Sequence, residues 1–356
     1  MSRFIDEKYS SLEEYVPGEQ PTDMQYIKLN TNESPFPPSP LVAQAITKQE
    51  IDMLELYPDP ECKSLIKKLA DIYGFDKENI FVGNGSDEIL NFAFMAFCQN
   101  GAAFADITYG FYQVFADLYG IKADVKPLKE DFSIDPADYM GIGKAVFIAN
   151  PNAPTGMILS VEDIEKIVVS NPDNVVVVDE AYIDFGGKSA VDLVRKYDNV
   201  LIVRTYSKSR SLAGGRLGFS IGSKEITSDL KKLKFSTNPY NINRLTLIAG
   251  EASLYDQNYY KENCAKIIMN REYTRNELDR MGFVTLPSIT NFLFTKHPSI
   301  SGEKFYEKLK ENGILVRHFK KDRIKDYVRV TIGTYDQMKA FVSEARYILE
   351  REERGK

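Results

Sequence analysis

The feature that most restricts how this chain can fold is a series of short apolar runs separated by helical stretches. The runs are rich in β-branched residues and comprise 80–82, 145–149, 175–178, 200–203 and 217–221. Strands that are apolar throughout suit a sheet covered on both faces, and intervening helices such as 161–170 suit the crossovers between parallel strands. The alternation therefore predicts an α/β domain with a mostly parallel sheet over residues 41–250, which begins with helices over 41–55 and 61–74.

The chain beyond residue 250 follows a different order. A long helix over 251–281 leads to strand 292–294, helix 302–311, strands 314–316 and 328–331, and a helix from 335 to the end. This order predicts a second, small α+β domain over 251–356. Four prolines between Asn32 and Pro40 exclude a helix or a central strand there, so residues 1–40 are expected to form an arm that joins the small domain.

Composition narrows the classes of function. The formal net charge of −6 argues against a broad nucleic-acid-binding surface. No apolar run approaches the roughly 20 residues of a membrane-spanning helix, and the N-terminus lacks the apolar core of a signal peptide. Cys62, Cys98 and Cys264 have no metal-ligand spacing, and neither His297 nor His318 has a second histidine or a cysteine nearby in sequence. We therefore expect a cytoplasmic protein with reduced thiols and no metal site.

Polar segments follow four of the predicted strands. They are Gly83–Glu88, Asn150–Gly156, Asp179–Tyr182 and Arg204–Arg216. Ligands of doubly wound sheets bind beyond the carboxyl ends of the strands, so these segments are where a ligand site is expected. Small residues before a helix favour an anion, but the first segment lacks the Gly-Lys-Ser/Thr of a nucleotide P-loop.

Each segment by itself also has a simpler interpretation. Ser86 or Asp87 suits an N-cap, Asn152 a turn residue, Asp179 a solvent-facing strand end and Lys208 a solvated surface residue. Together, however, they supply the groups that pyridoxal phosphate requires. A lysine forms an imine with the cofactor, a carboxylate keeps the pyridine nitrogen protonated, an amide contacts the phenolic oxygen, and helix N–H groups, hydroxyls and an arginine hold the phosphate.

The segments also resemble a known group of enzymes. Thr205–Gly214, continuing to Arg216, resembles the lysine signature of the fold-type I pyridoxal-phosphate-dependent transferases, and the preceding motifs resemble the histidinol-phosphate aminotransferases among them. The other matching motifs are Leu29–Glu33, Leu56–Asp59, Gly83–Glu88, Asn150–Gly156, Asp179–Tyr182 and Tyr240–Asn243. The resemblance covers nearly the whole chain and implies the fold of that group, a mostly parallel large domain with a smaller α+β domain.

The resemblance also implies roles for individual residues. Lys208 would carry the cofactor and move a proton at the substrate's α-carbon, Asp179 would pair with the pyridinium, and Tyr109 would stack on the ring. Asn152 and Tyr182 would contact the phenolic oxygen. Further cofactor-binding residues would be Gly85, Ser86, Asp87, Thr205, Ser207 and Arg216, with Tyr57 reaching across from the other subunit of a homodimer with shared active sites. Arg329, Arg317 and Tyr15 would bind the substrate.

The implied reaction is transamination between histidinol phosphate and 2-oxoglutarate in histidine biosynthesis. One arginine pocket would accept the phosphate of one substrate and the carboxylate of the other. The alternatives are a threonine-phosphate decarboxylase, an aromatic amino-acid aminotransferase and a non-enzymatic regulator that senses the cofactor, although residues 1–40 lack a basic helix-turn-helix pattern. Ala153, the run Ser34–Pro38 and the long side chain of Arg210 depart from the family pattern.

Overall fold

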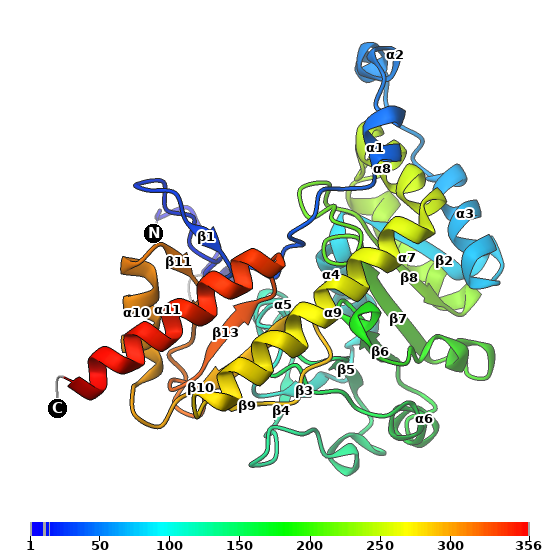
Figure 1. Cartoon of the computed structure of the whole chain (residues 1–356). Coiled ribbons are helices and arrows are strands. Elements are labelled where there is room, and N and C mark those ends of the chain that lie inside the picture. The colour runs from blue at the N-terminus through cyan, green and yellow to red at the C-terminus, as the bar shows by residue number, and fades with distance from the viewer. Residues whose placement is uncertain (1, 10–11, 14, 355–356) are drawn as a thin grey trace.

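The structure is a computed structural model that describes residues 2–9, 12–13 and 15–354, and a large sheet forms its centre (Figure 1). Within the described part this sheet has seven strands in the order β2-β8-β7-β6-β5-β3-β4. Their bounds are β2 Ile80–Gly83, β3 Ala102–Ala105, β4 Ala123–Lys126, β5 Ala145–Ala149, β6 Val176–Asp179, β7 Val200–Thr205 and β8 Gly218–Gly222. Only β8 runs antiparallel to its neighbours, so the predicted mostly parallel α/β sheet is confirmed.

Strands β3 and β4 were missing from the sequence prediction. Strand β3 has the sequence Ala-Ala-Phe-Ala, without a β-branched residue, and β4 lies at the sheet edge and is only partly buried. These two strands form by pairing with neighbouring strands of the sheet, because Ala102 of β3 lies opposite both Ala145 of β5 and Ala123 of β4. Tertiary context therefore decides these two strands against weak local preference.

Helices cover both faces of the large sheet. Those associated with it are α1 Pro40–Ala45, α2 Lys48–Asp52, α3 Lys63–Tyr73, α4 Gly85–Phe97, α5 Phe111–Tyr119, α6 Val161–Ser170, α7 Lys224–Thr237 and α8 Arg244–Tyr255. Alternate residues of one strand belong to different cores: Val176 and Val178 lie in the core that includes residues of α3 and α6, whereas Val177 lies in the core that includes residues of α4 and α5. Burial on both faces explains why these strands are apolar throughout.

Two predicted helices are each divided in the structure. The helix expected over 41–55 ends at Ala45, and α2 begins after Thr47, whose side chain accepts a hydrogen bond from the N–H of Glu50. The helix expected over 251–281 consists of α8 and α9 (Gln257–Arg280), and the Asp256 side chain accepts from the N–H of Tyr259. In both cases a capping residue interrupts an otherwise helical pattern.

The C-terminal part forms a second, smaller sheet with its own core (Figure 1). The antiparallel order is β12-β13-β10-β9, and α10 and α11 pack beside it. The bounds are β9 Val284–Thr285, β10 Phe292–Lys296, α10 Gly302–Glu311, β11 Ile314–Leu315, β12 Arg317–His318, β13 Val328–Thr331 and α11 Tyr335–Arg354. The last two residues of the helix predicted from 335 lie outside the described part. Strand β1 (Ile27–Lys28) of the N-terminal arm pairs in parallel with β11. The domain boundaries near residues 40 and 250 stay predictions.

None of the described helices is both long and apolar enough to cross a bilayer. Across the described ranges, no group of three or more His, Cys, Asp or Glu side chains is arranged to hold a metal ion.

Candidate active site

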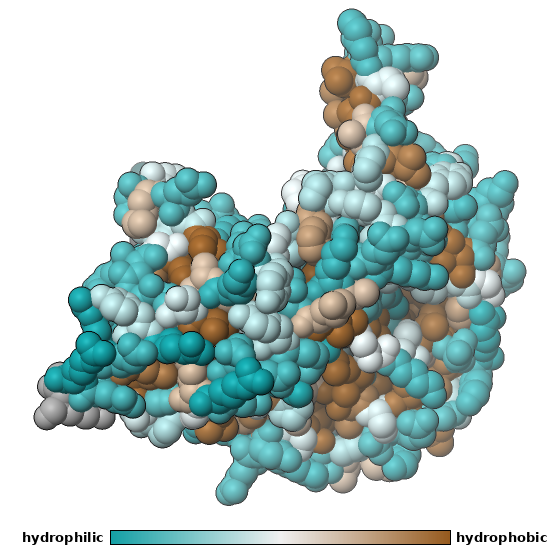
Figure 2. All heavy atoms as spheres, in the orientation of Figure 1, coloured by the Kyte–Doolittle hydropathy of each residue, from teal (hydrophilic) through white to brown (hydrophobic). Residues whose placement is uncertain are grey.

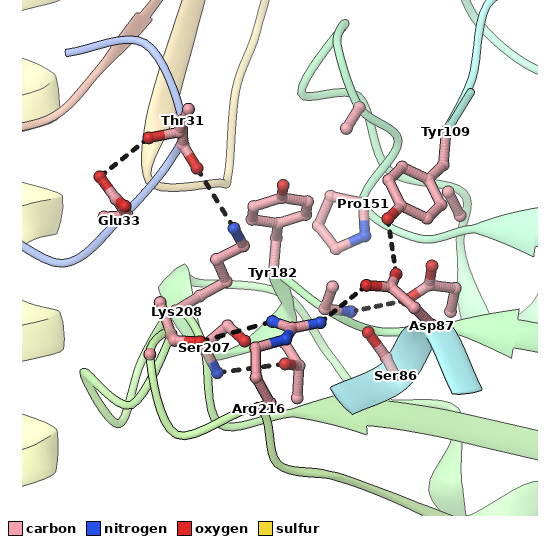
Figure 3. A pocket seen from close by; sticks show the side chains of 17 residues that line it. Thr31, Glu33, Ser86, Asp87, Tyr109, Pro151, Tyr182, Ser207, Lys208 and Arg216 are labelled. Atoms are coloured by element: carbon pink, nitrogen blue, oxygen red, sulfur yellow. Dashed lines mark hydrogen bonds and ion pairs between the residues drawn. The ribbon is translucent and has the colours of Figure 1, made fainter. Parts of the chain in front are cut away.

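A cavity of about 340 Å³ lies at the carboxyl ends of the parallel strands, where the polar segments meet (Figure 3). It contains most of the residues that the sequence predicted for a cofactor: Ser86, Asp87, Tyr109, Asp179, Tyr182, Thr205, Ser207, Lys208 and Arg216. Thr31 and Glu33 of the N-terminal arm also line it, so a segment distant in sequence closes one side of the cavity.

A second cavity adjoins the first and contains the residues predicted for substrate binding, Tyr15, Arg317 and Arg329. The two cavities share five lining residues, which are Thr31, Tyr109, Ala153, Tyr182 and Lys208. Lys208 therefore lies where the two cavities meet, within reach of a group bound in either.

The Lys208 side chain is half-buried and forms no ion pair with any residue that the structure describes. Its Nζ donates a hydrogen bond of 3.4 Å to the carbonyl oxygen of Thr31 and lies 5.8 Å from the centre of the Tyr182 ring (Figure 3). Among the residues the structure describes, no carboxylate oxygen lies within 4.0 Å of this ammonium group. A lysine without a salt bridge in a cavity is available for covalent chemistry.

Asp179 ends β6 and is buried at the floor of the first cavity. Its carboxylate accepts hydrogen bonds from the Tyr112 hydroxyl and from the N–H of Ala181, both at 3.1 Å. Burial raises the pKa of Asp179 to about 7. No basic side chain of the described part lies within 4.0 Å of it, so a buried carboxylate faces the cavity without a cationic partner. A protonated ring nitrogen would supply that partner.

The opposite side of the cavity carries free hydrogen-bond donors. Helix α4 begins without a side-chain cap, and the Asn84 amide nitrogen donates to the carbonyl of Asn241 at 2.7 Å. The hydroxyls of Ser86 and Ser207 have no hydrogen-bond partner among the described residues. A side chain at Gly218 would place its Cβ 2.5 Å from the Ser86 nitrogen, so only glycine permits this close approach. An uncapped helix N-terminus with hydroxyls and Arg216 beside it suits a phosphate.

Asp87, predicted as a cofactor-binding residue, lines the first cavity. It accepts a hydrogen bond from the Tyr109 hydroxyl at 2.6 Å and forms a 2.8 Å ion pair with Arg216 (Figure 3). Burial, together with Asp87, raises the pKa of Tyr109 well above its usual value, so this phenol stays neutral. The carboxylate thus orients the tyrosine and the arginine. Gly85 lies behind Arg216, where a Cβ would come 2.6 Å from its Nη2.

Asn152 and Tyr57 lie outside both cavities. Asn152 is 2% exposed, and its amide donates to the carbonyl of Ile107 at 2.9 Å and to the Thr155 hydroxyl at 3.0 Å. Its amide N–H groups are thus used within the neighbouring turns, and its contact with a cofactor oxygen stays a prediction. Tyr57 is 78% exposed and stacks on Tyr240, with ring centroids 4.5 Å apart. Tyr182, by contrast, lines both cavities, and its hydroxyl accepts from the Asn32 amide at 2.9 Å.

The second cavity contains two guanidinium groups without carboxylate partners in the described ranges. Arg329 donates to the carbonyl of Asn30 at 3.0 Å, its Nε is buried without a partner, and burial lowers its pKa from the usual value. Arg317 donates to the carbonyls of Val16 and Pro17 at 3.0 and 3.1 Å. The Tyr15 ring packs on Phe111 with centroids 4.4 Å apart. Two unpaired arginines predict that this cavity receives an anionic group.

Sequence reasoning missed two residues that organise the site. The Tyr112 hydroxyl donates a hydrogen bond to Asp179. Tyr112 lies on the buried face of α5, together with Phe115 and Ala116. Arg204 forms a buried ion pair with Glu180. Asp179 of β6 lies opposite Val203 of β7, and this register brings the next residues, Glu180 and Arg204, side by side. Predicting the pair from the sequence would require knowing that β6 and β7 are neighbours.

Comparison with known proteins agrees with this geometry. Residues 24–344 match the family described as aminotransferase class I and II. The histidinol-phosphate aminotransferase of Brachyspira hyodysenteriae is 50% identical over 98% of this chain and 99% of its own length. The crystal structure of the histidinol-phosphate aminotransferase from Clostridium acetobutylicum has a TM-score of 0.83 at 26% identity, covering 91% of this chain and 99% of that one.

The crystal structure of the Sinorhizobium meliloti histidinol-phosphate aminotransferase, in complex with pyridoxal 5'-phosphate, has the same fold. Its TM-score is 0.83 at 24% identity, over 91% of this chain and 92% of that one. The family match and the high identity along nearly the whole length agree with the two adjoining cavities. The chain therefore belongs to the class I and II aminotransferases, and within them to the family of histidinol-phosphate aminotransferases.

Proposed function

We propose that this enzyme transfers an amino group from histidinol phosphate to 2-oxoglutarate, with pyridoxal phosphate as cofactor. The observation that carries the proposal is the position of Lys208 between a cavity with a buried carboxylate and free phosphate donors and a cavity with two unpaired arginines. Three relatives that are 48–50% identical over 96–98% of this chain are named histidinol-phosphate aminotransferases.

The residues of the first cavity fit the cofactor. The phosphate would be held by Ser86, Thr205, Ser207 and Arg216, whose donors converge beside the start of α4. Asp179 would hold the proton on the ring nitrogen, because its buried carboxyl group has no cationic side chain beside it in the described part of the chain. When bound, pyridoxal phosphate supplies an electron-withdrawing ring that stabilises negative charge at the substrate's α-carbon. Tyr109 would lie against the ring, and Lys208 would hold the cofactor covalently.

Lys208 would also act as the proton carrier. Its Nζ lies at the junction of the cavities, so it can take the proton from the substrate's α-carbon and return it on the cofactor side. Tyr182 borders both cavities and would contact the phenolic oxygen, with its hydroxyl already fixed by Asn32. For Asn152 to share that contact, its amide would have to leave Ile107 or Thr155.

Arg329 and Arg317 would bind the anionic ends of both substrates. A guanidinium fork accepts two oxygens of a phosphate or of a carboxylate, which suits a pocket that receives histidinol phosphate and 2-oxoglutarate in turn. The Arg329 Nε has no partner in the described structure, so an incoming oxygen would satisfy it.

We further propose a homodimer with shared active sites. Helix α2 and the residues after it project from the rest of the molecule, and this projection carries apolar surface (Figures 1 and 2). The exposed side chains there are Ile51, Leu54, Leu56 and Tyr57. A partner subunit would cover them and would receive Tyr57 beside its cofactor phosphate. The three free, buried cysteines agree with the cytoplasm as the proposed compartment.

The decisive experiment is a substrate panel with the purified enzyme. Histidinol phosphate with 2-oxoglutarate should give glutamate, whereas phosphothreonine should not lose carbon dioxide and aromatic amino acids should react slowly. The Lys208→Ala variant should be inactive, and borohydride should fail to fix the cofactor to it. Turnover of phosphothreonine or of an aromatic amino acid without turnover of histidinol phosphate would refute the substrate assignment. A wild-type protein that takes up no cofactor would refute the whole proposal.

A further inference from the structure

A third cavity, of about 500 Å³, lies away from the active site between α3, α7 and the edge strand β2. It shares no lining residue with the two active-site cavities. Five lysines line it: Lys63 and Lys67 from α3, Lys77 before β2, and Lys231 and Lys234 from α7. The carboxylates among its lining residues are those of Glu61 and Glu78. The proposed reaction uses none of these residues.

Lys234 is the most constrained of the five lysines. It is 4% exposed, and its Nζ donates to the carbonyl oxygen of Pro60 at 2.6 Å and lies 3.9 Å from the Sγ of Cys62. In the part of the chain that the structure describes, no carboxylate oxygen lies within 4.0 Å of this ammonium group. A buried charge is costly unless it is paired with an opposite charge. An anion from solution could therefore act as the counter-ion of Lys234.

The other lysines add to this excess of positive charge. Lys63 is paired with Glu61 at 2.5 Å, but Lys67, Lys77 and Lys231 form no ion pair with any described residue. The whole chain has a net charge of −6, so this concentration of ammonium groups is not a consequence of a basic composition. A cavity that gathers charge of one sign raises the local concentration of counter-ions.

The start of α3 points to the same ligand class. Cys62 occupies its N-cap position with φ of 53°, and its side chain does not cap the helix. The Asp59 carboxylate accepts from the N–H of Lys63 at 2.8 Å, whereas the Ser64 hydroxyl, which lines the cavity, has no partner within the described residues. The first turn of α3 thus lines the cavity beside the buried ammonium group of Lys234, with the Ser64 hydroxyl available to a bound anion.

We propose that this cavity binds a small anion with two or more negative charges, either a phosphate compound or a polycarboxylate. The site uses lysines as point charges and has no arginine among its lining residues, so it should select for charge more than for planar shape. A bound anion would link α3 to α7. It would also hold the loop 56–62, which carries Tyr57, against the body of the subunit.

The test is hydrogen–deuterium exchange of the cofactor-loaded enzyme with pyrophosphate, phosphate or citrate, at an ionic strength kept constant with chloride. Pyrophosphate and citrate should slow exchange in peptides covering 60–67 and 231–236, and phosphate should do so more weakly. The double variant Lys67→Gln/Lys231→Gln removes two charges at side chains that are exposed or half-buried, so its fold should be retained. It should need at least about tenfold more pyrophosphate for the same protection.

Two controls separate this site from other effects. The variant Lys188→Gln/Lys339→Gln removes the same charge elsewhere on the surface and should bind pyrophosphate as the wild type does. Arg329→Met removes anion binding in the active site and should leave the protection at 60–67 unchanged. Protection that survives Lys67→Gln/Lys231→Gln, that is lost equally in the Lys188/Lys339 control, or that disappears with Arg329→Met would overturn the proposal. The outcome does not depend on the proposed reaction, because exchange is read without turnover.

Discussion

Asp179 has an unusual electrostatic position for a carboxyl group, since it is buried, faces a cavity and has no cationic partner among the described residues. With its pKa raised to about 7, the folded apoenzyme keeps this proton at pH values where the unfolded chain, near pKa 3.8, has released it. Between about pH 4 and 7 the folded state therefore binds more protons, and the contribution of Asp179 to stability falls as the pH rises.

This position predicts a pH-dependent effect of Asp179→Asn on the apoenzyme. The variant should be more stable than the wild type by about 1–2 kcal/mol at pH 5 and by at most about 4 kcal/mol at pH 8, because the neutral amide avoids a buried charge. Urea unfolding of both apoenzymes at the two pH values measures this difference. A difference that is the same at pH 5 and pH 8 would show that Asp179 does not titrate as described.

Arg329 should separate substrate binding from cofactor binding. In Arg329→Lys the charge stays but the fork that accepts two oxygens is lost, so KM for both substrates should rise by about tenfold or more. The absorbance of the bound cofactor should not change, because Arg329 lines only the second cavity. Steady-state kinetics with each substrate varied test this, with the exposed Arg351→Lys on α11 as the matched control. An unchanged KM would remove Arg329 from the substrate site.

At the scale of secondary-structure elements, a buried ion network joins the ends of β6 and β7. The Arg204 guanidinium lies 3.1 Å from the Glu180 carboxylate and also pairs with Asp184, which accepts from the Ser209 hydroxyl at 2.6 Å. Burial opposes ionisation of Asp184, but Arg204 keeps its pKa below the usual value. Glu180 follows Asp179 and Ser209 follows Lys208, so the network fixes two functional residues relative to each other.

The network predicts that Arg204→Met is strongly destabilising. Glu180 and Asp184 would remain buried without their cation, at a cost of about 3–5 kcal/mol. Adding Glu180→Gln and Asp184→Asn should recover part of this loss, because the stranded charges disappear. Chemical denaturation of the single, double and triple variants measures the coupling. If the effects simply add, the three residues do not form one unit.

The sequence predicted the central strands and the residues at their carboxyl ends because burial on both faces leaves long apolar runs, and polar residues mark where those runs end. It did not predict β3, whose alanines carry little strand preference, or the breaks at Thr47 and Asp256, where the apolar pattern continues across a cap. The Arg204 network and the orientation of Asn152 depend on strand neighbours and on turn hydrogen bonds, which a linear pattern does not contain.

At the scale of the whole molecule, two features are not explained by contacts within a single chain. The projection that includes α2 exposes Ile51, Leu54 and Leu56. Tyr57, which the sequence predicts for the active site of the other subunit, does not line the cavity of its own chain. Both follow if a second copy of the chain packs against the projection and receives Tyr57 in its own active site. An isolated subunit would then be incomplete, and activity would depend on assembly.

Mixed dimers provide the sharpest test of a shared site. Lys208→Ala and Tyr57→Ala should each be inactive or strongly impaired as pure dimers. When the two variants are unfolded together and refolded, about half of the dimers should be hybrids with one complete site, formed by Lys208 of one chain and Tyr57 of the other. The mixture should thus regain about a quarter of wild-type activity, because one of the two sites in each hybrid is intact. Sedimentation of the same samples checks that dimers have formed. If the mixture is only as active as the average of its two components, Tyr57 acts within its own chain and the sites are not shared.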